Sequence, residues 1–137
     1  MGLPGSLVLK GMVVGTMEPQ AIDMRLDTGS MVSMISQNHW LAVGSPSMIQ
    51  DEVIQDIRDA HGDKLQITGR VWVNLSIGNV DYGYPMSIVE GLDMEVVLGA
   101  DFLKDVQARV DFGRMSVSLS TSSPVPMLEA GGKHQRL

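Results

Sequence analysis

Apolar and polar residues alternate with a period of two through much of the chain, and this pattern constrains the fold more than any other feature. The alternation is clearest at residues 22–26 and 65–77. Successive side chains of a β-strand point to opposite faces, so the pattern predicts strands with one buried face. Gly78 and Asn79 follow the longer stretch and are typical of a tight hairpin turn, after which residues 80–89 are predicted to return as a strand.

Several shorter segments with the same character are also predicted to be strands. The first contains a glycine and is either one bent strand or a tight pair, and the last reads as a hairpin around Gly113. These segments are residues 7–14, 32–35, 94–98 and 110–119.

Helices are scarce in the predicted structure. Ser36 is a typical N-cap for a short helix that ends at Gly44. A second short helix is predicted at residues 101–106, with Asp101 as its cap. The stretch 44–59 fits either a helix or a strand. Many short strands with two short helices predict an all-β domain.

The size and composition of the chain fit one domain. The chain has 137 residues, of which 44% are hydrophobic but only 4% aromatic, so aliphatic residues and 11 methionines must fill the core. Residues 1–119 are predicted to form the domain. Residues 120–137 are rich in Ser, Pro and Gly, and we expect them to be a disordered tail.

Charge and cysteine content narrow the classes of function. The formal net charge is −6 and no basic run is interleaved with aromatic residues, which argues against a nucleic-acid partner. The chain has no cysteine, so it has no disulfide and no thiol nucleophile, which suits a reducing, cytoplasmic setting. No signal peptide and no membrane-spanning run are recognisable, so we expect no membrane association.

The residues Asp27-Thr28-Gly29-Ser30 are the most conspicuous group that could carry chemistry. They follow the strand predicted at 22–26, so a carboxylate, a hydroxyl and a glycine lie on a tight turn. Such turns are common in soluble proteins, and the tetrapeptide alone does not establish a function. The alternative of Asp27 as a metal ligand lacks companion ligands, because His39, His61 and His134 have no partner at ligand spacing, and we expect no metal or other cofactor.

A second motif, later in the chain, supports a functional interpretation of the first one. Residues 96–103 read Val-Val-Leu-Gly-Ala-Asp-Phe-Leu, apolar residues followed by a glycine and the start of a helix. Together the two motifs resemble the retropepsin family of aspartic proteases, above all those of long-terminal-repeat retrotransposons and their domesticated cellular relatives. The resemblance extends over roughly residues 7–119. It implies a closed β-barrel that forms a homodimer, with the active site on the two-fold axis, in the cytoplasm or within a virus-like particle.

The resemblance also implies an activity and a role for each residue of the first motif. Two Asp27 carboxylates, one from each copy, would activate a water that hydrolyses internal peptide bonds of a polypeptide. The Thr28 hydroxyl would hold the two loops together across the axis, and Gly29 would leave room for the substrate backbone. Ser30 would hydrogen-bond the outer oxygen of Asp27 and favour its ionised form.

Two further segments take roles from the resemblance. Ala60, His61, Gly62 and Asp63 match the tip of a flap that covers the substrate, and the segment with Leu98 and Gly99 would support the catalytic loop from behind.

The sequence departs from the viral pattern at two linked positions. Many viral members carry an acid and an arginine that form a salt bridge supporting the dimer, and here Met31 and Ala100 occupy these places. Both partners are absent together, so no lone charge is left buried. The alternative from another class is a dimerisation or peptide-binding module with this fold and weak or no activity.

Overall fold

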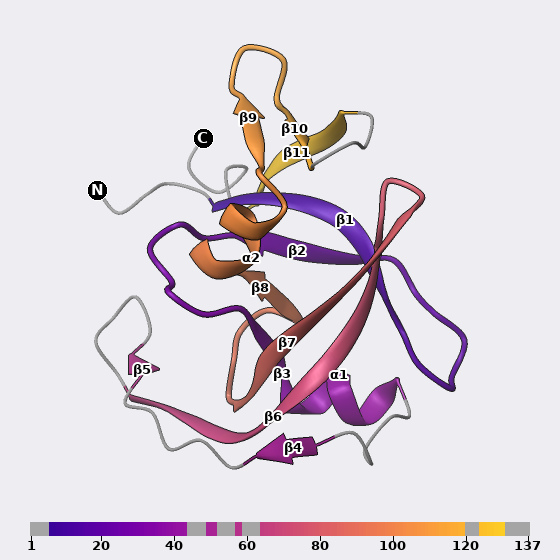
Figure 1. Cartoon of the computed structure of the whole chain (residues 1–137), viewed down its shortest axis with the longest axis vertical. Helices are drawn as coiled ribbons and strands as arrows, with labels where there is room; N and C mark the ends of the chain where they lie inside the picture. Colours follow the sequence, from indigo (N-terminus) through magenta and orange to yellow (C-terminus); the bar gives the residue numbers. More distant parts are fainter. Residues whose placement is uncertain (1–5, 44–48, 52–56, 59–63, 120–123, 131–137) are drawn as a thin grey trace.

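The computed structural model describes residues 6–43, 49–51, 57–58, 64–119 and 124–130 (Figure 1). In these ranges strands dominate, and two helices of six residues each accompany them. The elements in chain order are β1 (Ser6–Val14), β2 (Ile22–Leu26), β3 (Met34–Ser36), α1 (Gln37–Ala42), β4 (Ile49–Asp51), β5 (Ile57–Arg58), β6 (Lys64–Ile77), β7 (Val80–Glu90), β8 (Val96–Leu98), α2 (Ala100–Asp105), β9 (Arg109–Asp111), β10 (Ser116–Ser118) and β11 (Val125–Ala130).

Six of these strands close into a barrel. They pair in the order β6–β7–β3–β8–β2–β1, and the pairing of β1 with β6 completes the ring. β1 is a single strand that changes partner along its length: Val8–Gly11 pair with β2, whereas Met12–Val14 pair with β6. The predicted all-β fold with a closed barrel is therefore confirmed.

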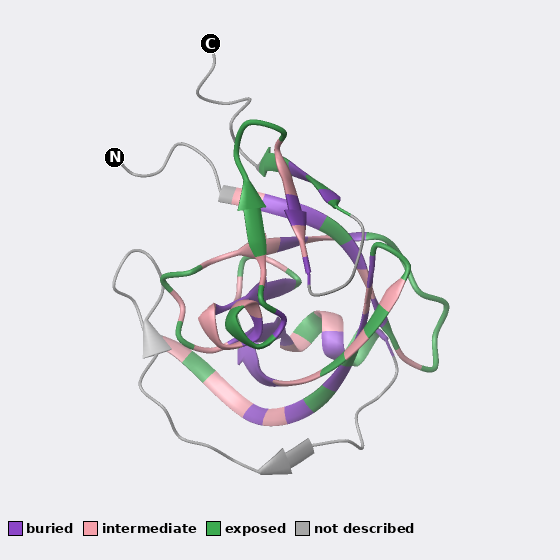
Figure 2. Ribbon diagram, turned by 45° about the horizontal axis from the view of Figure 1, so that its top comes forward, coloured by how far each residue is buried: buried purple, intermediate pink, exposed green. Residues whose placement is uncertain are grey.

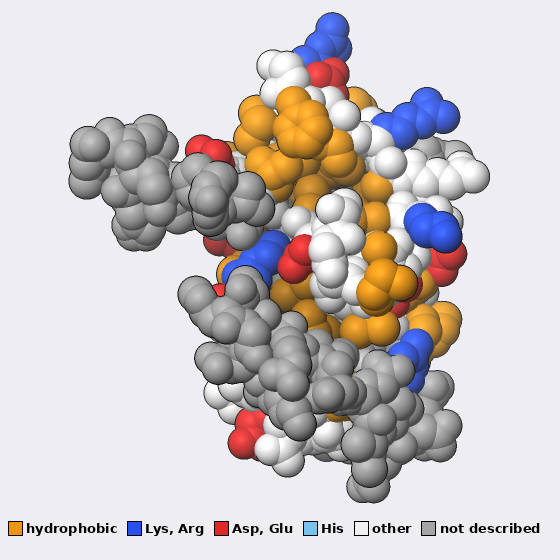
Figure 3. Space-filling view, turned by 90° about the vertical axis from the view of Figure 1, so that its left-hand side faces the viewer, with side chains coloured by type: hydrophobic (Ala, Val, Ile, Leu, Met, Phe, Trp, Pro, Cys, Tyr) orange, Lys and Arg blue, Asp and Glu red, His pale blue; other side chains and the backbone are white. Residues whose placement is uncertain are grey.

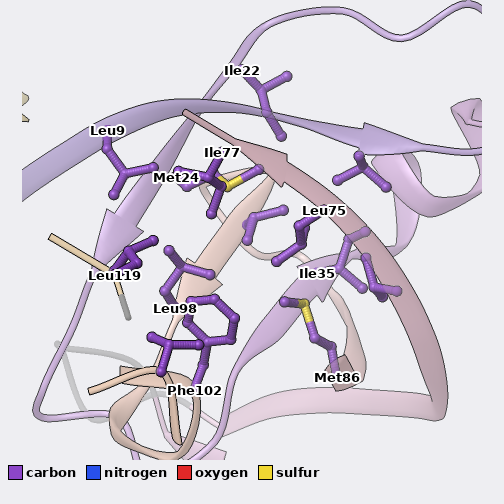
Figure 4. Packing of buried hydrophobic residues seen from close by; sticks show 14 of the residues in the cluster. Leu9, Ile22, Met24, Ile35, Leu75, Ile77, Met86, Leu98, Phe102 and Leu119 are labelled. Carbon is purple, nitrogen blue, oxygen red and sulfur yellow. The ribbon is translucent and has the colours of Figure 1, made fainter. Parts of the chain in front are cut away.

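The interior of the barrel follows the alternation seen in the sequence. In β6, Val71, Val73, Leu75 and Ile77 are fully buried and the residues between them are not (Figure 2). The helix α2 contributes Phe102, which lies in the interior beside Leu98 and Met86 (Figure 4). Few aromatic side chains are available, so aliphatic residues and methionines fill most of the core.

The predicted turn at Gly78 and Asn79 and the predicted cap at Ser36 agree with the structure. Gly78 and Asn79 both have positive φ, 59° and 67°, as the tight turn between β6 and β7 requires. Ser36 caps α1, because its hydroxyl accepts a hydrogen bond from the His39 amide at 3.0 Å. Of the stretch that fitted either a helix or a strand, the described residues form the strands β4 and β5.

The expectation of disorder from residue 120 onward is wrong for the residues of β11. This strand pairs with β1 on one side and β10 on the other, so the folded domain extends to Ala130. Val125 and Met127 are buried, with Pro126 and Leu128 exposed. The period-two pattern is thus present, but the surrounding Ser, Pro and Gly residues obscure it.

β11, β10 and β9 extend the sheet beyond the barrel. Their order is β1–β11–β10–β9, which makes β9 the outermost described strand at this end of the sheet. In Figure 1 this terminal sheet lies at the top, above the barrel. In the described part of the chain, no helix is long and apolar enough to cross a membrane.

Candidate active site

The two sequence motifs meet at one end of the barrel because β2 and β8 are parallel neighbours. Leu26 lies opposite Leu98, so the residues that follow each strand leave the sheet at the same edge. The Asp27 amide donates a hydrogen bond to the Leu98 carbonyl at 3.0 Å, and the Ala100 amide donates to the Ser30 carbonyl at 2.7 Å. Residues 27–30 are thereby tied to residues 98–100.

The loop after β2 is a tight turn that holds Asp27 at the surface. The Ser30 amide donates to the Asp27 carbonyl at 3.1 Å, and the Gly29 amide donates to the Asp27 carboxylate at 3.0 Å. Asp27 is half-buried, whereas Thr28 and Gly29 are exposed. One carboxylate oxygen is thus oriented by the backbone while the group remains accessible.

Gly99 lies directly behind this loop. A Cβ atom at Gly99 would come within 2.5 Å of the Val32 carbonyl oxygen and 2.8 Å of the Ser30 carbonyl oxygen. The backbone of Gly99 is extended, with φ −85°, so the requirement is for space and not for an unusual conformation. The absence of a side chain at Gly99 lets the start of α2 pack against the loop.

Two residues that the sequence did not assign to the site hold the loop from the other side. The Ser33 hydroxyl donates to the Asp101 carboxylate at 2.7 Å, and the Ser33 amide donates to the same carboxylate at 3.2 Å. The Ser33 oxygen in turn accepts from the Gly99 amide at 2.9 Å. Ser33 is buried and links β8, α2 and the end of the loop through one buried and two partly buried hydrogen bonds.

The expectation that Asp101 caps α2 is therefore wrong. Gly99 occupies the N-cap position and has no side chain to form a cap. The Asp101 carboxylate accepts from Ser33 and from the amide of Phe102. A serine six residues after Asp27 and an aspartate two residues after Gly99 could have suggested the pair, but only together with the parallel pairing of β2 and β8.

Ser30 also differs from its expected role. Its hydroxyl donates a hydrogen bond to the Val32 carbonyl at 2.7 Å and so stabilises the backbone of the loop. The expected hydrogen bond to the outer oxygen of Asp27 is replaced by this one, because the turn directs the side chain toward the following residues.

The remaining site predictions fall elsewhere in the chain. The predicted flap tip, residues Ala60, His61, Gly62 and Asp63, lies outside the described residues.

A hollow of about 320 Å³ is present where α1 begins. Its lining includes His39, Asp93 and Glu95 but not Asp27. Burial lowers the pKa of His39, against the opposing effect of Glu95. No three His, Asp or Glu side chains among the described residues are grouped so that they could hold a metal ion.

The face that carries the loop is partly apolar. Figure 3 looks onto it and shows hydrophobic side chains gathered in the upper half of the view, above a band of backbone and polar side chains. Met31, which follows the Asp27 turn, is 79% exposed. Met31 and Ala100 carry no charge, so no ion pair can form between these two positions.

We expect Ser33→Ala to destabilise the fold because it leaves the buried Gly99 amide without an acceptor. The loss should be about 1–3 kcal/mol of unfolding free energy, measured by urea denaturation. Ser36→Ala is a matched control: it removes the α1 cap, costs about 1 kcal/mol and leaves the loop intact. Equal unfolding free energies for Ser33→Ala and the unmodified protein would contradict the assigned hydrogen bond.

A closed six-stranded barrel with an Asp-Thr-Gly turn held against a Leu-Gly segment defines the retropepsin-like class of folds, and solved structures bear this out. The retroviral protease-like domain of Ddi1 from Leishmania major superposes with a TM-score of 0.72 at 16% identity, covering 90% of this chain and 94% of that one. The EIAV protease, solved with the inhibitor HBY-793, gives a TM-score of 0.59 at 16% identity, covering 82% of this chain and 98% of that one.

This chain therefore has a retropepsin-like fold, as the two motifs predicted. No protein-family model matches it, and no curated protein matches its sequence.

Proposed function

We propose that the protein is an aspartic endopeptidase that acts as a homodimer. The observation that supports the proposal is the position of Asp27. It is an accessible carboxylate on a turn held by hydrogen bonds, in a fold shared with a retroviral protease-like domain and with a protease. The chain contains one Asp-Thr-Gly sequence, and its 137 residues are too few for two lobes of this kind. In this proposal the second carboxylate comes from a second copy, and the site lies on the two-fold axis between the copies.

In this proposal the two Asp27 carboxyl groups share one proton, because two negative charges held so close together repel each other. The ionised carboxylate removes a proton from a water molecule, whose oxygen attacks the carbonyl carbon of the peptide bond, while the protonated carboxyl gives its proton to the carbonyl oxygen. Breakdown of the resulting tetrahedral intermediate transfers a proton to the departing amine and breaks the C–N bond.

The neighbouring residues take supporting roles in the proposal. Thr28 is exposed at the tip of the turn, where its hydroxyl can reach the equivalent loop of a second copy. Gly29 orients Asp27 through its amide and presents no side chain to a substrate. The flap assigned to residues 60–63 remains a prediction from the sequence.

Activity that depends on dimer formation is the test of this proposal. Cleavage of an unstructured protein substrate should be blocked by pepstatin, and activity per mole of chain should rise with protein concentration through the dimer dissociation constant. Sedimentation on the same samples measures the dimer. The pH–rate profile should be bell-shaped, because one carboxyl must be protonated and the other ionised. A sample that is dimeric but cleaves nothing would favour the dimerisation module, and activity strictly proportional to chain concentration in monomeric samples would exclude the shared site.

A further inference from the structure

Arg25 lies on the same face of the sheet as Asp27, two residues before it. In β2, Met24 and Leu26 pack against the barrel core, so Arg25 between them points to the outer face. The hydrogen bond from the Asp27 amide to β8 extends the pairing of β2 with β8 by one residue, and the same alternation directs the Asp27 side chain outward. The two Cα atoms are about 7 Å apart, the length of two residues of extended chain.

The outer face around Arg25 is apolar. Val8 of β1 and Val97 of β8 lie opposite Arg25 on its two sides, and each is 1% exposed. Val97 belongs to a small apolar cluster on this face, together with Met34 and Val89. Partly buried residues packed against this cluster are Val32, Leu65, Ile67, Leu92 and Met94. The charge of Arg25 therefore has apolar neighbours on both adjoining strands, where water screens it less than at an open surface.

The guanidinium of Arg25 has more hydrogen-bond donors than the described residues supply acceptors. Its side chain is 22% exposed, and Nη2 contacts one carboxylate oxygen of Asp93 at 3.2 Å. The Nε atom is buried and has no hydrogen-bond partner among the residues that the structure describes. A guanidinium carries five N–H groups and can hold a carboxylate through two of them, so this single contact leaves capacity for a second acceptor.

Asp93 is a weak competitor for that capacity. Its side chain is 74% exposed in the loop between β7 and β8, and an exposed ion pair with one contact contributes little. A ligand carboxylate that lies against the apolar face is better shielded from water and interacts more strongly with the same guanidinium. A cationic ligand would instead meet Asp93, which is already paired and largely solvated, and Arg25 would repel it.

We propose that Arg25 determines the substrate preference of the site by binding an acidic side chain of the peptide, aspartate or glutamate, close to the bond that is cleaved. The inference rests on the proposed function, because it takes Asp27 as the group that acts on that bond. An extended peptide advances about 7 Å in two residues, so the side chain that reaches Arg25 lies within about two residues of the cleaved bond. Its carboxylate accepts from the N–H groups that Asp93 leaves free.

A set of peptides tests this preference. The peptides are unstructured and identical except for Asp, Asn, Leu or Lys at one position, which is moved through the sequence. Mass spectrometry of the products gives the distance of that position from the cleaved bond, and kcat/KM is measured for each peptide. At one position near the bond, Asp should exceed Asn by about 10-fold, because only the carboxylate makes charge-assisted hydrogen bonds, and Lys should be the poorest.

Two single variants show whether Arg25 causes the preference. Arg25→Met keeps an unbranched apolar side chain and removes the charge, so Asp and Asn peptides should then be cleaved equally well. Lys10→Met is the matched control. Lys10 also carries a positive charge on this face and pairs with Asp23, but Asp23 lies four residues before Asp27, so this variant should keep the preference.

Exchange of the two charges tests the sign of the interaction. The double variant Arg25→Glu with Asp93→Lys retains an ion pair in the reverse direction, and its preference should change from Asp to Lys at the same position. Circular dichroism and urea unfolding check that each variant folds. A folded double variant that still prefers Asp would contradict the proposal.

Cleavage and binding distinguish failure of this inference from failure of the proposed function. Equal cleavage of all peptides, or a preference that Lys10→Met removes as Arg25→Met does, would overturn the role of Arg25 and leave the peptidase intact. If nothing is cleaved, calorimetry measures binding of the same peptides. Tighter binding of Asp peptides that Arg25→Met abolishes would support the Arg25 site while the proposed function fails alone. Equal binding of all peptides, or no binding, would overturn both.

Discussion

Asp27→Asn should abolish peptide cleavage while leaving the fold and the dimer intact. Asparagine keeps the shape of the side chain and an oxygen that can accept the Gly29 amide, so the turn is preserved. It cannot exchange a proton with water or substrate, and both halves of the dyad lose this ability at once. The rate should fall by at least about 100- to 10,000-fold.

The measurement compares kcat of the two proteins at concentrations where sedimentation shows both to be dimers. Mixing Asp27→Asn chains in excess with unmodified chains should also reduce activity, because mixed dimers carry only one carboxylate. A variant that still cleaves, after contaminating protease is excluded, would refute the assignment of Asp27.

Gly99→Ala should strongly destabilise the domain. The added Cβ would meet the backbone of Val32 at 2.5 Å, and backbone packed on both sides cannot move away as a flexible side chain could. Overpacking of this kind costs roughly 1–3 kcal/mol, and a backbone clash belongs at the upper end. Since domains are stable by only about 5–15 kcal/mol, the loss should be plain in urea denaturation.

The clash also predicts a loss of activity greater than the loss of stability alone would explain. To relieve the clash, α2 must move away from residues 30–32. The Asp27 turn would move as well, because Ser30 is hydrogen-bonded both to Asp27 and to Ala100 at the start of α2. Gly113→Ala is the control, because a Cβ there would have only an ordinary contact of 3.4 Å with the Asp111 side chain. Unfolding free energies that are equal for the two variants would mean that the loop and α2 are not packed as described.

Most of the barrel was predictable because its strands carry their own local signals. The burial of alternate residues in β6 follows directly from the alternation at 65–77, and Gly78 and Asn79 mark the turn. The site was predictable in outline because two short motifs flank parallel strands. β11 was missed because its neighbours have the composition of a disordered tail, and its burial depends on β1, more than 110 residues earlier in the chain.

The supporting hydrogen bonds were not predictable from local patterns. Asp101 next to a helix start favours a capping role by its position alone, and only the pairing of distant strands brings Ser33 within 2.7 Å of it. The Ser30 hydroxyl could likewise donate to more than one acceptor, and the geometry of the turn determines that it donates to the Val32 carbonyl. Strand register and loop direction depend on the assembled barrel, so they cannot be predicted from single residues.

The pairing of β1 with β11 determines how the domain responds to mechanical tension. Ser6 lies opposite Ala130, so the described chain enters and leaves the domain at neighbouring points of an antiparallel pair. A pull on the two flanking segments therefore loads the hydrogen bonds between these strands one after another, as in unzipping, and not all at once, as in shear. Each pair that opens loosens β11, through which β10 and β9 are joined to the barrel. Tension along the polypeptide would thus open the pairs of Ser6 and Leu7 with β11 first, and would then reach Val8, which pairs with β11 on one side and with β2 on the other.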